Sequence, residues 1–548
     1  MNAVLRHLVV LPILVPLVAG AVMFFVLEAR RAVRVTLALA STAAQLAVAI
    51  GLLYLTSDAA PYIWPEGVGV YAIGGWPAPF GIVLVVDRLT AIMLTLGAMV
   101  STATMVYSIA RWDRPGQPFH SLFQFLTMGL NGAFLTGDLF NLFVFFEVLL
   151  AASYGLMLRG GGGTRVKLGL HYITINLAAS LLFLIGVALI YGMAGTLNMA
   201  DLAGRAAALA PADRVLFDAG AAILGIAFLV KAGSWPLNFW LPGAYSAAVA
   251  PVAASFAMMT KVGFYAVLRL GTLMHEYESL GAALFYIGLL TLVTATIGLL
   301  AAKHLARQVA FTVLISMGIL LASLGLRNEA LTAPALFYLI VSALTTATFF
   351  MLTGMTERTR TTDAPAMPED RLVEVEPTYS AYGIKRPSIY QMNEEEAGVA
   401  IPAAMAFLGM MFACCVLLVS GLPPLSGFLA KFALLATMLR ADAAGQVSVS
   451  AWVLGATIVL SGLVTVIALS RIGMRLFWSD AGRREPRLRL LEAAPVAALV
   501  LACLGLTLAA DPVARYLDST ARSLHQPDTY IRAVLSRETR RERPADTP

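Results

Sequence analysis

Four ionisable residues lie inside long apolar segments of the chain. They are Glu147, Lys231, Lys261 and Lys431, and each has mainly apolar neighbours. A charged side chain at the centre of a lipid bilayer costs about 2.5–3.5 kcal/mol, so four cost roughly 10–14 kcal/mol, which is comparable with the net stability of a domain. Residues this costly persist mainly where function needs them. We therefore treat these four as the candidate functional residues.

Lysine and glutamate in such surroundings can move protons. Burial disfavours the charged form of a lysine, whereas a nearby carboxylate favours it. Buried lysines that are linked by water can therefore accept and release protons near neutral pH. The alternative is structural: Glu147 pairs with one lysine as a link between helices, and the other lysines extend to the membrane surface. Three lysines for one glutamate favour the relay.

Lys231 and Lys431 both lie close to predicted interruptions of helices. Proline has no N–H group to donate, and its ring displaces the preceding carbonyl, so a helix opens next to it. One predicted break follows Lys231 directly, and the other comes one turn before Lys431. Interrupted helices at corresponding positions in two halves of a transporter point to an ion site. The residues that should cause the breaks are Pro236, Pro423, Pro424 and Gly427.

Other polar residues have weaker signals. Lys261, Tyr265 and Arg269 are spaced i, i+4, i+8, so they share one face of a helix, which must meet protein or water. Arg269 is near the predicted helix end, and we expect it to extend to the surface. His171 could pass protons at the mouth of its helix, although an interfacial histidine without a transport role explains it equally well.

Two aspartates have structural explanations in the sequence. Asp87 stands beside Arg88 near the start of an expected span, and we expect the two to form an ion pair at the membrane interface. Asp138 precedes another span, where a short acidic side chain can cap the first turn of a helix.

The elements that must position these residues are transmembrane helices. The chain has 548 residues, of which 59% are hydrophobic and 13% charged, and its mean hydropathy is +0.80. A soluble domain has about 25% charged residues. Apolar stretches of around 20 residues, the length that crosses a bilayer as a helix, recur throughout. We predict an all-α membrane protein with about fourteen transmembrane helices. The expected spans are 8–28, 35–57, 82–110, 119–137, 138–158, 168–192, 216–248 (broken), 251–272, 280–302, 305–326, 330–355, 400–440 (broken), 450–475 and 489–511.

The distribution of basic residues predicts the orientation. Lys and Arg gather in every second loop, whereas the loop 57–80 has neither. Basic loops stay in the cytoplasm, so both termini are expected on the periplasmic or extracellular side of a cell (inner or plasma) membrane. The polar segment 356–399 is then a cytoplasmic loop or subunit contact. The tail after Asp511 is expected to be partly disordered, and 197–215 to hold a short helix on the outer surface.

Four ordered motifs resemble one superfamily. The segment 137–148, GDLFNLFVFFEV, resembles the fifth-helix signature of the antiporter-like proton-pumping subunits. KAGSWPLNFWLP from Lys231 resembles their broken seventh helix, KVGFYAVLR from Lys261 their eighth, and LPPLSGFLAK ending at Lys431 their broken twelfth. Within that superfamily, 191–202 and 396–402 are most similar to the D-type component of Mrp-type multisubunit cation/proton antiporters, in the potassium-efflux (Pha) branch.

The resemblance implies a fold and roles for residues. It implies inverted repeats of five helices, with an N-terminal three-helix segment (1–110), a first repeat (111–280), a second repeat (281–475) and a last helix with a polar tail (476–548). Glu147 and Lys231 would form a proton-coupled pair, Lys261 a relay, and Lys431 the gate toward the far channel. The chain departs from the family in the eleventh helix, which has no titratable base midway along the relay. Water held by Ser342, Thr345 and Thr346 would have to bridge this gap.

Three functions follow from these observations. The first is a proton-translocating subunit of a Na⁺(K⁺)/H⁺ antiporter, which transports ions instead of catalysing a reaction and works with other membrane subunits. The second is a homologous subunit of an NADH–quinone oxidoreductase, although no motif here is typical of a flavin, quinone or iron–sulfur site. The third, prompted by the eleventh helix, is a scaffold that has lost transport. The sequence predicts no cofactor and no nucleic-acid partner, and does not identify a metal site.

Overall fold

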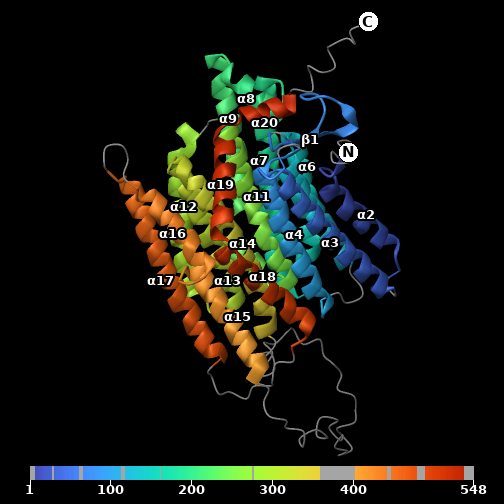
Figure 1. Cartoon of the computed structure of the whole chain (residues 1–548), viewed down its shortest axis with the longest axis vertical. Helices are drawn as coiled ribbons and strands as arrows, with labels where there is room; N and C mark the ends of the chain where they lie inside the picture. The colour runs from blue at the N-terminus through green and yellow to red at the C-terminus, as the bar shows by residue number, and fades with distance from the viewer. Residues whose placement is uncertain are drawn as a thin grey trace, which may run out of the picture.

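The chain folds into a bundle of long helices (Figure 1). The computed structural model describes residues 7–27, 30–60, 64, 66–112, 118–160, 162–274, 277–357, 402–440, 446–477 and 488–535. Twelve of the helices described are long and apolar enough to cross a membrane. The predicted class, an all-α membrane protein, is confirmed.

The long apolar helices share the length that a bilayer requires. They are α3 (Arg31–Leu55), α4 (Arg88–Ile109), α6 (Leu139–Met157), α7 (Gly163–Ala194), α9 (Pro211–Ala232), α11 (Ala250–Met274), α12 (Tyr277–Ala301), α13 (Leu305–Gly325), α14 (Thr332–Thr356), α15 (Pro402–Ser420), α17 (Val449–Phe477) and α18 (Leu490–Leu508).

The remaining elements are shorter. The helices are α2 (Leu11–Phe25), α5 (Phe119–Leu135), α8 (Met199–Ala207), α10 (Trp240–Ala247), α16 (Ser426–Met438), α19 (Ala510–His525) and α20 (Asp528–Leu535), with 3-10 turns η1 (Ile73–Gly75) and η2 (Glu329–Leu331). Strand β1 (Gly69–Ala72) pairs antiparallel with β2 (Val83–Val86), with Gly69 opposite Val86.

Every expected span coincides with one helix, or with two where a break was expected. The broken spans are α9 with α10, and α15 with α16. The first and fourth expected spans are α2 and α5, whose 15 and 17 residues are short for a full crossing. Fourteen crossings and the inverted repeats therefore stay predictions, as do the four segment boundaries.

The centre of the bundle consists of α11, α13 and α14. In the most apolar stretch of α11, 94% of the residues are buried inside the protein, and the share is 89% in both α13 and α14. The corresponding share in α18 is 28%. Helix α11 packs against α4, α9 and α14, and α14 also packs against α16. The helix that carries Lys261 is thus enclosed by the helices that carry, or lie next to, the other candidate residues.

One end of the bundle carries the small extramembrane elements, and we call it the α8 end. Helices α8 and α20 lie there with the β1–β2 hairpin (Figure 1), and α20 packs against α8 and β1. The short helix expected within 197–215 is α8. Helix α15 extends towards the opposite end.

The C-terminal tail is helical as far as Leu535, and residues 536–548 lie outside the described part of the chain. The tail after Asp511, expected to be partly disordered, forms α19 and α20 through Leu535. Leu517 and Leu524 are buried, whereas Asp511 and Arg515 are exposed, so α19 is an amphipathic helix on the bundle. The expected loop 356–399 lies outside the described residues, except for its first two.

Candidate functional site

Glu147 and Lys231 are joined through a third residue, Ser180 of α7. The Lys231 ammonium donates a hydrogen bond to Ser180 Oγ at 3.2 Å, and the Ser180 hydroxyl donates to Glu147 Oε1. A hydroxyl can accept a proton on one side and donate on the other. The pair predicted from the sequence is therefore brought together, with a hydroxyl placed to carry a proton between its members.

The two partners differ in burial. Lys231 is 5% exposed, and its Nζ lies 4.9 Å from the centre of the Phe146 ring, which favours a cation. Glu147 is only half-buried, on the side of α6 that carries the exposed Phe140 and Val144. Glu147 is thus less enclosed than its apolar sequence surroundings predicted.

A small cavity adjoins Lys231. It measures about 10 Å³, roughly the room for one water molecule, and its lining includes Tyr172 and Asn176 of α7 and Met259 of α11. Met259 lies two residues before Lys261. The cavity therefore lies on the side of Lys231 that faces the helix of the next lysine.

Lys261 is the most enclosed of the three lysines, with 0% exposure. Its ammonium donates to Ser316 Oγ of α13 at 2.7 Å and lies 3.5 Å from Met317 Sδ. Both partners are neutral. A charge held only by neutral acceptors in a buried site is costly, so these partners do not fix Lys261 in its charged form.

Lys431 lies at the second helix break. It belongs to α16, yet its ammonium donates to the carbonyls of Val419 and Ser420 in the last turn of α15, each at 2.9 Å. The last carbonyls of a helix have no partners in the helix and carry its partial negative charge. The break therefore makes a cation site, and Lys431 occupies it.

The two breaks end their helices in the same way. Helix α9 stops at Gly233 with φ 73°, and α15 stops at Gly421 with φ 79°, a left-handed conformation that favours glycine. Lys231 is in the last turn of α9, so both Lys231 and Lys431 have their charge next to a helix C-terminus. The expected causes of the breaks, Pro236, Pro423 and Pro424, lie in the interruptions.

Gly427 has a different role from the one expected. It lies inside the first turn of α16, not in the break. A Cβ there would lie 2.0 Å from the carbonyl oxygen of Leu418, so glycine allows α16 to approach α15 closely.

The expected polar face of α11 is present, but the surface position expected for Arg269 is wrong. Tyr265 donates to the carbonyl of Phe134 at 2.7 Å. Arg269 does not reach the surface: it is 4% exposed and donates two hydrogen bonds to Asp87, at 2.6 and 2.7 Å. Arg88 pairs instead with Asp58. The expected Asp87–Arg88 pair is therefore wrong.

The other secondary candidates separate into two groups. His171 is exposed on α7, with its ring against Phe239. The hydroxyls of Ser342, Thr345 and Thr346 are buried in α14, which packs against both α11 and α16, and they donate to carbonyls of their own helix. Thr345 Oγ1 also lies 4.0 Å from Cys503 Sγ of α18. The bridge that these hydroxyls would form between Lys261 and Lys431 stays a prediction. Asp138 caps α6 as expected, through the N–H of Asn141 at 2.9 Å.

Sequence reasoning missed the partners of the lysines. Ser180 is the one serine of α7, Ser316 is one of two in α13, and the carbonyls of Val419 and Ser420 have no signature of their own. Nothing local distinguishes these groups from other polar atoms of membrane helices. Among the described residues, no cluster of His, Cys, Asp and Glu could hold a metal ion.

Comparison with known proteins gives consistent results. The family model described as "NADH:quinone oxidoreductase/Mrp antiporter, TM" matches residues 136–382. The chain is 49% identical to the probable D-type component of a K⁺/H⁺ antiporter of Rhizobium meliloti, over 97% of this chain and 98% of that protein. It is 31% identical to the D-type component of an Na⁺/H⁺ antiporter of Bacillus subtilis, over 97% and 100%.

Solved structures agree with these relatives. A chain of the Mrp complex from Dietzia sp. superposes with a TM-score of 0.79 at 25% identity, covering 97% of this chain and 99% of that chain. A chain of respiratory complex I from Thermus thermophilus gives 0.73 at 21% identity, covering 96% and 99%, which shows a shared fold. The chain belongs to the D-type components of Mrp-type monovalent cation/proton antiporters, within the NADH:quinone oxidoreductase/Mrp antiporter transmembrane family.

Proposed function

We propose that the chain is the proton-translocating membrane subunit of a multisubunit antiporter that exchanges Na⁺ or K⁺ for protons. The observation that carries this proposal is the burial of Lys231, Lys261 and Lys431, at 5%, 0% and 5% exposure, with neutral acceptors on each ammonium. A salt bridge would fix a lysine in its charged form, whereas a hydroxyl or carbonyl does so less strongly. The three lysines are therefore suited to gaining and losing protons.

The order of the relay follows the packing of the helices. Glu147 and Lys231 exchange a proton through Ser180, and water beside Lys231 extends the path toward α11. Lys261 comes next, and α14 packs against both α11, which carries Lys261, and α16, which carries Lys431. Water on the hydroxyls of α14 would bridge the two lysines. The partners of this chain are the other membrane subunits of its antiporter complex, since its structural relative belongs to an Mrp complex. These subunits, or a cation site outside this chain, couple the protons to Na⁺ or K⁺.

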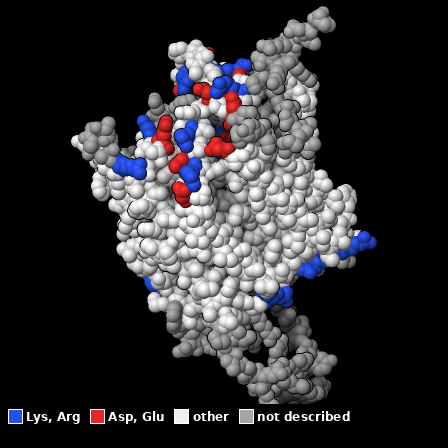
Figure 2. Space-filling model, viewed as in Figure 1, with Lys and Arg blue, Asp and Glu red and all other residues white. Residues whose placement is uncertain are grey.

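We further propose that the α8 end faces the periplasm or the exterior of a cell membrane. Figure 2 shows acidic and basic side chains together at that end, then a broad belt without charges, then Lys and Arg alone toward the opposite end. Basic residues without acidic ones mark the cytoplasmic side. Both termini would then be outside.

The test uses the whole complex in everted membrane vesicles. Glu147→Gln, Lys231→Ala and Lys431→Ala should each abolish cation-induced proton flux, with the subunit still present in the membrane. Lys303→Ala is the matched control, because this lysine is exposed between α12 and α13. Normal transport in the three variants would rule out the relay. Comparing Na⁺ with K⁺ in the same vesicles identifies the cation.

A further inference from the structure

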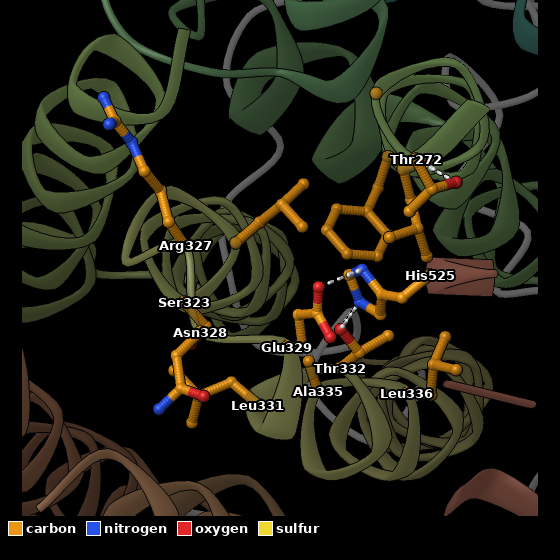
Figure 3. Close-up of a pocket in the computed structure, with 14 residues that line it drawn as sticks. Thr272, Ser323, Arg327, Asn328, Glu329, Leu331, Thr332, Ala335, Leu336 and His525 are labelled. Carbon is orange, nitrogen blue, oxygen red and sulfur yellow. Dashed lines mark hydrogen bonds and ion pairs between the residues drawn. The ribbon is translucent and has the colours of Figure 1, made fainter. Parts of the chain in front are cut away.

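A large cavity at the α8 end lies above Lys261. It measures about 490 Å³ and is enclosed by α11, α13, η2 and α14, with His525 of α19 at its side (Figure 3). It does not touch Glu147, Lys231 or Lys431, and the relay described above makes no use of it.

The cavity lies along the same faces of α11 and α13 as Lys261 and its partner Ser316. Leu268 and Thr272 line the cavity and follow Lys261 by 7 and 11 residues, so they lie on its side of α11. On α13, the lining residue Ser323 follows Ser316, the hydrogen-bond partner of Lys261, by 7 residues. Seven residues of helix span about 10 Å. The floor of the cavity is therefore two helical turns from the buried ammonium.

The floor of the cavity contains a buried hydroxyl that water could satisfy. Ser323 is 1% exposed, and its hydroxyl has no hydrogen-bond partner among the described residues. A buried hydroxyl without a partner is unfavourable, and water satisfies it where there is room. The cavity offers far more than the volume of one water, so a water on Ser323 would be continuous with those above it. Phe264 and Leu268 also line the cavity, and such apolar groups can interrupt a water chain until it wets.

Two titratable side chains, His525 and Glu329, lie at the side of the cavity. The ring of His525 is held on both sides, with Nε2 2.8 Å from Thr332 Oγ1 and Nδ1 3.7 Å from Glu329 Oε1 (Figure 3). Histidine exchanges protons near neutral pH. The Glu329 side chain is 75% exposed, so it meets solvent directly, and Arg327 adds a positive charge at the rim.

We propose that this cavity is a water-filled vestibule through which Lys261 exchanges protons with the α8 side, and that His525 with Glu329 receives and releases those protons. This route differs from the one through Lys431 that the family resemblance implies. A proton on His525 passes to vestibule water, then to the water on Ser323, and reaches Lys261 when the apolar constriction wets. The role of the vestibule in proton exchange rests on the proposed function of the chain, whereas the presence of water in the vestibule does not.

Hydration is tested without transport. Ser323→Cys is made in a background without Cys414, Cys415 and Cys503, and the intact complex is treated with a membrane-impermeant cationic methanethiosulfonate in right-side-out and everted vesicles. Ala322→Cys is the matched control, because it is adjacent on α13 and fully buried but does not line the cavity. We expect Ser323→Cys to react about tenfold faster or more, since thiol reactivity follows access to water. Equal rates would overturn the vestibule.

Proton exchange is tested in the same complex. His525→Gln keeps a polar side chain but cannot titrate, and should lower cation-driven proton flux several-fold, whereas the exposed Arg522→Gln on the same helix should not. Normal flux in His525→Gln would overturn the role of His525. Lys231→Ala distinguishes failure of the role of His525 from failure of the proposed function. If Lys231→Ala also transports normally, the proposed function itself has failed.

Discussion

Gly421 connects the second helix break to the charge of Lys431, and Gly421→Ala should disturb both. The residue has φ 79°, which costs alanine about 1–2 kcal/mol. A Cβ would also lie 2.5 Å from Lys431 Cδ, so the lysine must leave its position.

The magnitude follows from these two effects. An off-rotamer side chain costs about 0.5–1.5 kcal/mol, which brings the total to roughly 1.5–3.5 kcal/mol. The ammonium also loses its alignment with the carbonyls of Val419 and Ser420. We expect proton flux to fall about tenfold or more, equivalent to about 1.4 kcal/mol in the transport barrier.

The assay compares Gly421→Ala with Gly225→Ala in the purified complex. No atom lies within 4 Å of a Cβ at Gly225, which is inside α9, so this control should be neutral or stabilising. Flux is measured in proteoliposomes and stability by thermal unfolding in detergent. If Gly421→Ala equals the control in both measurements, Lys431 is not held by the geometry of the break.

Two further variants test buried contacts. Asp87→Asn should destabilise the protein by about 3–5 kcal/mol, because it leaves the buried Arg269 charge without its carboxylate partner. In denaturant titrations, the double variant Asp87→Asn/Arg269→Met should recover much of this loss. Purely additive losses of stability would contradict the pairing. Ser316→Ala removes the hydroxyl that accepts from Lys261 and should lower proton flux several-fold with normal assembly, whereas Ser316→Thr should retain flux; equal flux in both would show that the hydroxyl is dispensable.

The helices and the breaks could be predicted from the sequence because both have local causes. A run of about 20 apolar residues is sufficient for a crossing, and Pro236 or Pro423 stops a helix wherever it stands. The burial of Lys261 could be predicted because it shares a polar face with Tyr265 and Arg269 on an otherwise apolar helix, and such a face must meet protein or water.

What could not be predicted depends on distant contacts. Arg269 finds Asp87 across 182 residues of sequence, and nothing near either residue indicates the other. His171 lies on a helix that is apolar all round, so its sequence does not say which face meets the bundle. The tail after Asp511 was expected to be partly disordered because the charged face of α19 dominates its composition, so the sequence did not indicate that His525 lies beside Thr332 and Glu329.

The central claim is tested most directly at Lys261, which is fully buried and, in the described part of the chain, has Ser316 and Met317 but no carboxylate as hydrogen-bond partners. Lys261→Met keeps a long apolar side chain but cannot carry a proton, so cation-driven proton flux through the reconstituted complex should fall to background, while Lys303→Met transports normally. Normal flux in assembled Lys261→Met would contradict the account, because a proton would then cross the centre of the bundle without its most enclosed carrier.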